Sequence, residues 1–201
     1  MFDPGRFPQL AEYIARLPDG LDSYPECKAK GTMILTALEG HDLAPVTDHL
    51  PARVVELVRD PPSSGLWVPG PMSDAIFYAV VDTFYPTQAE AFEWTRVRTR
   101  KAAQSKLYRA LARVTSPKTL LRMANAAHGL FQRGTDLEAT YGTDEATLTL
   151  THPPHLHGGL NHRVNCPMFE EILLGAGAGQ ARVEMVESTP ERAVYEAKWT
   201  T

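Results

Sequence analysis

The chain has 201 residues, of which 43% are hydrophobic and 22% are charged, a composition that supports a folded core and excludes intrinsic disorder. Its start lacks the cationic and then apolar pattern of a signal peptide, and no apolar run approaches the length of a membrane span. Two cysteines do not make a disulfide framework, so we expect a cytoplasmic protein with no membrane partner.

The net charge of −4 averages two unlike parts of the chain. Residues 94–135 contain ten of the 20 lysine and arginine residues and no acidic residue. All 24 acidic residues lie in the rest of the chain. A strongly basic segment, which reads as mainly helical, is therefore set in an acidic surround.

The first part of the chain reads as short helices. Apolar residues recur at helical spacing in residues 7–17, 28–38 and 73–84, and a further helix is expected from Pro51. Gly31 inside the second of these helices indicates close packing or a later helix start. We expect a surface loop at residues 61–71. Thr87 followed by Glu90 predicts a capping box at the next helix.

The pattern changes towards the C-terminus. Ser116 and Pro117 predict a helix that continues to Arg133, and beyond it the apolar residues alternate, as is typical of strands. The segments that follow are predicted as a hairpin (137–141 and 146–150), a loop (152–161), a helix opened by Pro167, and two strands (181–186 and 193–199). The predicted fold is α+β, a single domain over residues 1–201 with a helical first two-thirds followed by a β-β-α-β-β layer.

Several short motifs suggest a family. They are CKAKG at residues 27–31, LP at 50–51, FQRGT at 131–135, GAG after the late helix, and YEAKW at 195–199. With them the chain resembles a largely myxobacterial family of domains of unknown function. More distantly, its element order is similar to the four-vinyl-reductase-like sensor domains and the heme–nitric oxide binding domains. The resemblance implies an α+β fold with a pocket between the helices and the small sheet, and a role in small-molecule sensing.

The more distant resemblance also bears on cofactors. Heme–nitric oxide binding domains have a histidine in the helix before the hairpin, and His128 falls there. Their Tyr-x-Ser-x-Arg signature for the heme propionates is absent, because the hairpin reads Tyr141-Gly-Thr-Asp-Glu. Metal-binding members of the sensor group use a cysteine cluster, which this chain lacks. His128 is equally explained as a hydrogen-bonded core residue, so the cofactor stays open between heme, zinc and none.

A histidine-rich segment before Pro167 is the densest polar cluster. His155 and His157 would face one side of an extended chain, and His162 and Cys166 are one helical turn apart. Imidazole and thiolate are the ligands that zinc prefers, so these four residues are candidate metal ligands. The spacing matches no common zinc motif, however, and a solvent-exposed polar loop is the alternative.

The basic segment also has two interpretations. It could dock on an acidic protein or nucleic acid through one face formed by Lys106, Arg109 and Arg113. Alternatively, its cations pair with acids of the same chain. The acids proposed for this pairing are Asp74, Glu90 and Glu170.

Three functions remain in order of preference. The favoured one is a non-enzymatic sensory or regulatory domain that binds a small apolar molecule in an apolar pocket, with His128, Tyr141 and Trp94 as its converging groups. The second is a metal-dependent enzyme built on the histidine-rich segment, and the third is an interaction module that uses the basic face. Association into a homodimer stays open.

Overall fold

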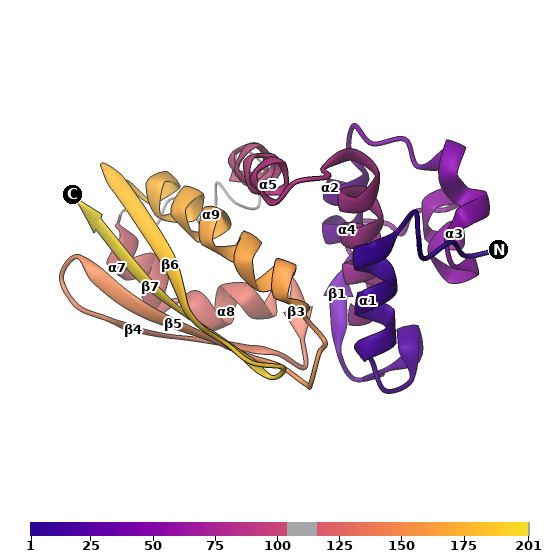
Figure 1. The fold of residues 1–201 in the computed structure, drawn as a ribbon. Coiled ribbons are helices and arrows are strands. Elements are labelled where there is room, and N and C mark those ends of the chain that lie inside the picture. Colours follow the sequence, from indigo (N-terminus) through magenta and orange to yellow (C-terminus); the bar gives the residue numbers. More distant parts are fainter. Residues whose placement is uncertain (104–115, 201) are drawn as a thin grey trace.

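The computed structural model describes residues 1–103 and 116–200, in which helices and two antiparallel sheets form an α+β fold (Figure 1). The predicted fold class is therefore confirmed. Figure 1 shows the N-terminal helices on one side and the larger sheet with its helices on the other, with the two termini at opposite ends. Within the described residues, no helix combines the length and apolar character needed to span a membrane.

The N-terminal part is a group of helices around one buried helix. Helices α1 (Pro8–Arg16), α2 (Gly31–Leu38) and α3 (Ala52–Arg59) pack against α4 (Gly70–Phe84), and short 3-10 helices at Gly20–Asp22 and Ala44–His49 connect them. Every residue of α4 from its start to Val81 is buried, because neighbouring elements cover it on all sides. This helix is the centre of the first apolar cluster.

A small sheet corrects two of the sequence predictions. Strand β1 (Lys28–Lys30) pairs with β2 (Trp67–Pro69), which lies in the predicted loop, and with β3 (Gln132–Arg133). Helix α2 starts late, at Gly31, where a Cβ atom would lie 2.2 Å from the backbone oxygen of Ser63. Gly31 therefore marks both a later helix start and a position of close packing, the two explanations offered from the sequence.

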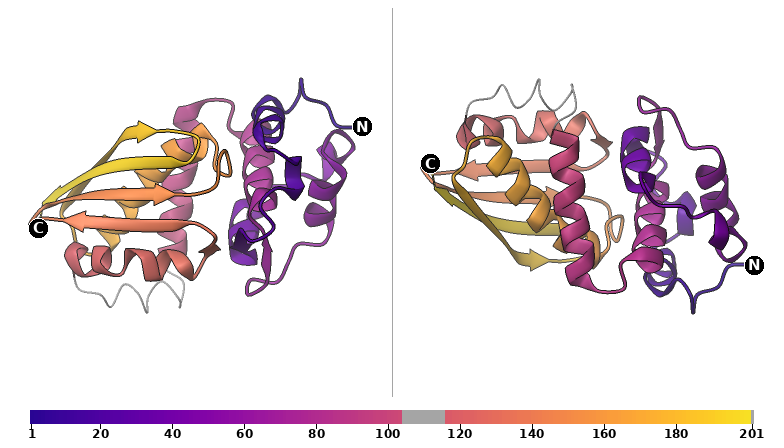
Figure 2. Two further views of the ribbon diagram at one scale, coloured as in Figure 1. Left: turned by 90° about the horizontal axis from the view of Figure 1, so that it is seen from below. Right: turned by 90° about the horizontal axis from the view of Figure 1, so that it is seen from above.

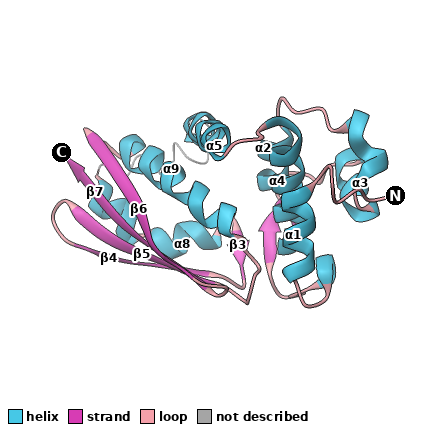
Figure 3. Cartoon of the chain, viewed as in Figure 1, coloured by secondary structure: helices cyan, strands magenta, loops and turns pink. Residues whose placement is uncertain are grey.

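The larger sheet has the order β4-β5-β7-β6, with every neighbouring pair antiparallel. Its strands are β4 (Asp136–Tyr141), β5 (Glu145–Thr151), β6 (Gln180–Ser188) and β7 (Arg192–Thr200). Helices α7 (Pro117–Arg122), α8 (Ala124–Gly129) and α9 (Gly159–Gly175) cover one face (Figures 1 and 3). The alternating apolar residues of the strands form the second apolar cluster against them. The predicted β-β-α-β-β order is confirmed.

Two helix boundaries differ from the prediction. The expected helix at residues 116–133 is divided into α7 and α8 and ends before strand β3, so Arg133 does not share a helix face with Lys118. Helix α9 begins at Gly159 and continues through Pro167. Proline removes one helical hydrogen bond, but Val164 before it packs in the first apolar cluster and Phe169 after it in the second. Packing on both sides of the proline therefore keeps the helix continuous.

Helix α5 (Gln88–Ala103) lies along α9 (Figure 2). The predicted capping box is confirmed at its start: the Thr87 amide donates to Glu90 Oε2 at 2.9 Å, and the Glu90 amide donates to Thr87 Oγ1 at 3.3 Å.

Three cations of α5 form ion pairs with acids elsewhere in the chain: Arg96 with Glu170 at 2.5 Å, Arg100 with Glu171 at 2.7 Å, and Lys101 with Glu39 at 2.7 Å. These cations support the interpretation that the basic segment pairs internally. Lys106, Arg109 and Arg113 lie outside the described residues, so their docking role stays a prediction.

Candidate functional site

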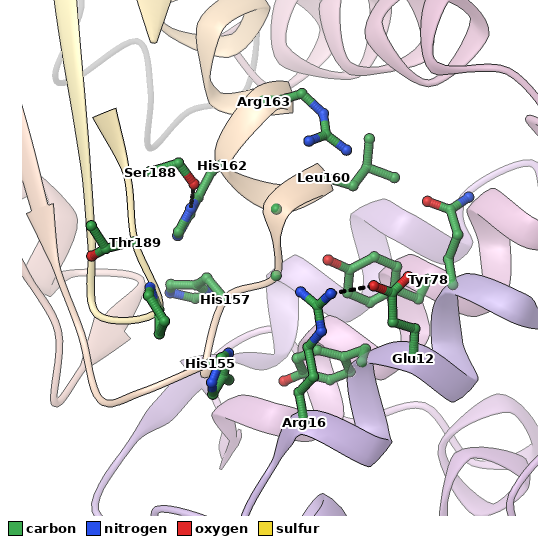
Figure 4. A pocket seen from close by; sticks show the side chains of 15 residues that line it. Glu12, Arg16, Tyr78, His155, His157, Leu160, His162, Arg163, Ser188 and Thr189 are labelled. Atoms are coloured by element: carbon green, nitrogen blue, oxygen red, sulfur yellow. Dashed lines mark hydrogen bonds and ion pairs between the residues drawn. The ribbon is translucent and has the colours of Figure 1, made fainter. Parts of the chain in front are cut away.

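A cavity of about 330 Å³ lies between the helical part and the larger sheet. Its walls come from α1, from Tyr78 of α4, from residues 155–163 at the start of α9, and from the turn between β6 and β7 (Figure 4). Most of the side chains on these walls carry hydroxyl, imidazole, guanidinium or carboxyl groups. The cavity is thus polar, unlike the apolar pocket that the sequence led us to expect.

The first turn of α9 forms one wall. Gly158 precedes it and provides no capping side chain, and a Cβ atom there would lie 2.2 Å from the Tyr78 hydroxyl. The backbone amide of Asn161 donates to this hydroxyl. The amides of Gly159 and Leu160 have no hydrogen-bond acceptor among the described residues. Helix starts leave such donors free, and here they adjoin the cavity.

His157 is held by a carboxylate from the helical part. Its Nδ1 lies 2.8 Å from Asp74 Oδ2, which also accepts from the Asn161 side-chain amide at 2.6 Å. The side chains of His157 and Asp74 are 10% and 12% exposed. Because the carboxylate accepts only, Nδ1 carries the proton, and in the neutral ring Nε2 is an acceptor. Among the described residues this buried Nε2 has no partner.

A separate series of hydrogen bonds connects the β6–β7 turn to the loop before α9. His162 Nδ1 lies 2.8 Å from Ser188 Oγ, His162 Nε2 lies 2.8 Å from His152 Nε2, and His152 Nδ1 lies 2.9 Å from the carbonyl of Pro153. The Pro153 carbonyl can only accept, so His152 Nδ1 carries the proton and His152 Nε2 accepts from His162 Nε2. His162 Nδ1 is then the acceptor of its own ring, and the Ser188 hydroxyl donates to it. Burial is the largest cause that lowers the pKa of His152 to about 3 and that of His162 to about 4. Both rings are therefore neutral at pH 7.

The residues predicted to bind a cofactor lie in three separate places, and none of them lines the cavity. Trp94 is buried in the first apolar cluster, stacked on Tyr85 with ring centroids 4.9 Å apart. Tyr141 packs beside the second cluster, and its hydroxyl accepts from Arg122 at 3.4 Å. His128 Nε2 lies 2.8 Å from Thr135 Oγ1, and burial lowers the pKa of this histidine to about 4.

The predicted metal ligands are also divided. His155, His157 and His162 line the cavity, whereas the Cys166 thiol accepts a hydrogen bond from the Met185 amide and packs beside the second apolar cluster. Burial raises the pKa of this thiol to about 11, which disfavours the thiolate that binds metals. In residues 1–103 and 116–200 no three His, Cys, Asp or Glu side chains are grouped so that they could hold a metal ion. The metal site stays a prediction.

Several residues of the site were missed in the sequence. Asp74, Tyr78 and Ser188 come from elements far along the chain from the histidine-rich segment, and no local pattern marks them. Two signals were present, however. His152 belongs to the same segment, and Gly158 with Gly159 is a pair that a helix start can follow.

Comparison with solved structures identifies the architecture. Similar structures include a mutant H-NOX containing 4-cyano-L-phenylalanine (TM-score 0.59, 14% identity, 86% of this chain and 97% of that chain) and a mutant H-NOX of T. tengcongensis (0.56, 14%, 85% and 95%). The chain has the H-NOX fold. An oxygen-binding H-NOX domain related to soluble guanylate cyclases matches with a TM-score of 0.53 at 15% identity, over 85% of this chain and 93% of that one. No family model and no curated protein matches the chain. At this identity the H-NOX likeness concerns the fold alone.

Proposed function

We propose that the chain is a non-enzymatic sensory domain that binds a small molecule in the cavity between α1, α4 and the first turn of α9. The position of the cavity carries this proposal, because its walls come from both the helical part and the sheet part. Its volume of about 330 Å³ lies at the lower end of the usual range for small-molecule sites, about 300–1,000 Å³. A ligand that contacts both parts can favour one arrangement of them over another, which is the physical requirement for a sensor.

Heme is considered separately as a ligand, since one of the similar H-NOX structures comes from a study of heme distortion. The Thr135 hydroxyl donates to Gln132 Oε1 at 3.2 Å and therefore accepts from His128, so His128 Nε2 carries a proton. A protonated, hydrogen-bonded nitrogen is not free to bind iron. Leu156 and His152 are also buried, in the segment that precedes α9. These contacts support our proposal of a heme-free ligand site.

Native mass spectrometry and an absorbance scan of the purified protein test the proposal. We expect the mass spectrum to show a small molecule bound to the chain, either co-purified or added, and we expect the absorbance scan to show no Soret band. Thr189 is exposed and lines the cavity, so Thr189→Trp should obstruct the cavity and weaken ligand binding by about tenfold or more, equivalent to at least about 1.4 kcal/mol. Thr143→Trp, at the exposed turn of the β4–β5 hairpin, is the control. A Soret band, or a ligand that binds equally well to both variants, would refute this assignment.

A further inference from the structure

The wall of the cavity at the start of α9 contains backbone hydrogen-bond donors. The amides of Gly159 and Leu160 at the start of the 17-residue helix α9 have no acceptor among the described residues. Free amides and the helix dipole together favour a negatively charged group at this position. The N-terminal end of α9 therefore provides one half of an anion site.

Arg163 provides the other half. Its guanidinium Nη1 lies 3.4 Å from the place where a Cβ atom of Gly159 would stand, so the charge lies against the same helical turn. Arg163 Nε is buried without a hydrogen-bond partner, and no acid forms an ion pair with this side chain among the described residues. A buried guanidinium nitrogen without an acceptor is costly unless a ligand provides one.

The remaining charges at the cavity do not neutralise Arg163. Glu12 of α1 also lines the cavity, but it forms an ion pair with Arg16 on the same helix (Figure 4). The unpartnered Nε2 of His157, whose side chain is nine-tenths buried, adds a requirement of a different kind. Because Nδ1 donates to Asp74, this Nε2 accepts a hydrogen bond in the neutral ring and suits a ligand hydroxyl.

We propose that the ligand is a small hydroxylated oxyanion: a carboxylate or phosphate group bound by the Gly159 and Leu160 amides and by Arg163, with a hydroxyl group that donates to His157. This inference rests on the proposed function and adds the chemical class of the ligand. Arginine suits both kinds of oxyanion because its planar guanidinium can donate two parallel hydrogen bonds.

Amide-detected NMR titration tests the inference at the level of single residues. The probes are lactate, inorganic phosphate and acetate, each added to the full chain. We expect lactate and phosphate to shift the amide signals of Gly159 and Leu160, and acetate, which lacks the hydroxyl, to bind several-fold more weakly. Arg163→Met should weaken lactate binding at least about tenfold, because it removes a charge-assisted hydrogen bond. Arg163→Lys, which keeps the charge but not the planar donors, should fall in between.

The control is Arg182→Met, since Arg182 is an exposed residue of β6 that pairs with Glu184. It should leave the titration unchanged, and the amide spectrum of each variant shows directly whether the protein is folded. Absence of shifts at Gly159 and Leu160 with all three probes overturns the inference. So does an identified cavity ligand that contains no oxyanion, although that result would leave the proposed sensory function standing.

Discussion

Two buried imidazoles, His152 and His162, and the partly buried ring of His128 are expected to make the stability of this protein depend on pH. His128, His152 and His162 each have a pKa lowered to about 4, 3 and 4, and burial is the largest cause for all three. Each makes at least one hydrogen bond as a neutral ring. Protonation of His152 or His162 would add a positive charge next to other imidazoles, and no carboxylate is among the groups that raise the pKa of either ring.

We therefore expect the free energy of unfolding to fall as the pH is lowered from about 6.5, the usual histidine pKa, towards 4. In this window the unfolded chain binds protons that the folded chain does not, so stability rises with pH. The slope is up to about 1.4 kcal/mol per pH unit for each histidine. Urea unfolding at several pH values measures it. His162→Gln should remove the contribution of one histidine to this slope. An unchanged slope would contradict a lowered pKa for His162.

The sequence located the site only in part. The segment at residues 155–162 was recognised from its histidines, and three of the four predicted metal ligands do line the cavity. Asp74 was named only as a possible partner of the basic segment; its contact with His157 could not be predicted, because it joins residues 83 positions apart. Tertiary packing alone brings them together, and a carboxylate in the middle of an apolar helix carries no local signal of its partner.

At the scale of elements, the basic helix α5 is attached to α9 by a buried acid. Glu171 is 7% exposed and accepts two hydrogen bonds from Arg100, each at 2.7 Å. Such a bidentate pair fixes the relative position of two helices. By contrast, Lys101 and Glu39 are both more than half exposed, where ion pairs contribute little.

Arg100→Met should therefore lower the melting temperature by several degrees, because it leaves the Glu171 carboxylate buried without its cation. Methionine keeps much of the apolar stem, so that the charge is the main change. Lys101→Met is the matched control and should shift the melting temperature much less. Thermal unfolding followed by circular dichroism measures both. Equal shifts would show that the Arg100–Glu171 pair has no special role.

The boundaries of α9 show why element prediction failed where it did. Pro167 and the histidine-rich segment before it suggested a loop followed by a helix start, a sound local inference. The structure continues the helix through the proline because Leu160 and Val164 pack in the first apolar cluster, beyond the reach of any local pattern. The hairpin at residues 136–151, in contrast, was predicted closely, since its alternation and its turn are local features.

At the scale of the whole molecule, we propose that residues 1–201 form a single domain. The first apolar cluster belongs to the N-terminal helices and the second to the larger sheet, but α9 contributes to both. The Tyr13 hydroxyl also donates to the Leu156 carbonyl at 2.9 Å, which joins α1 to the loop before α9. Elements shared in this way favour cooperative unfolding.

Two tryptophans test this proposal, because Trp94 is buried in the first cluster and Trp199 in the second. A variant with Trp67→Phe and Trp199→Phe reports on the first cluster, and one with Trp67→Phe and Trp94→Phe reports on the second. In each variant, urea unfolding followed by fluorescence should coincide with unfolding followed by circular dichroism. Separate midpoints for the two probes within one variant would divide the chain into two domains.

The pairing of β1 with β3 has a kinetic consequence. Lys28 faces Arg133 across this ladder, so the small sheet closes a loop of roughly a hundred residues. Isolated helices form within about a microsecond, but this closure requires the chain between the strands to have collapsed first. We infer that the β1–β3 ladder forms late, after the helices that lie between its strands. Refolding of this predominantly helical protein should then proceed more slowly than that of a simple helical bundle of the same length.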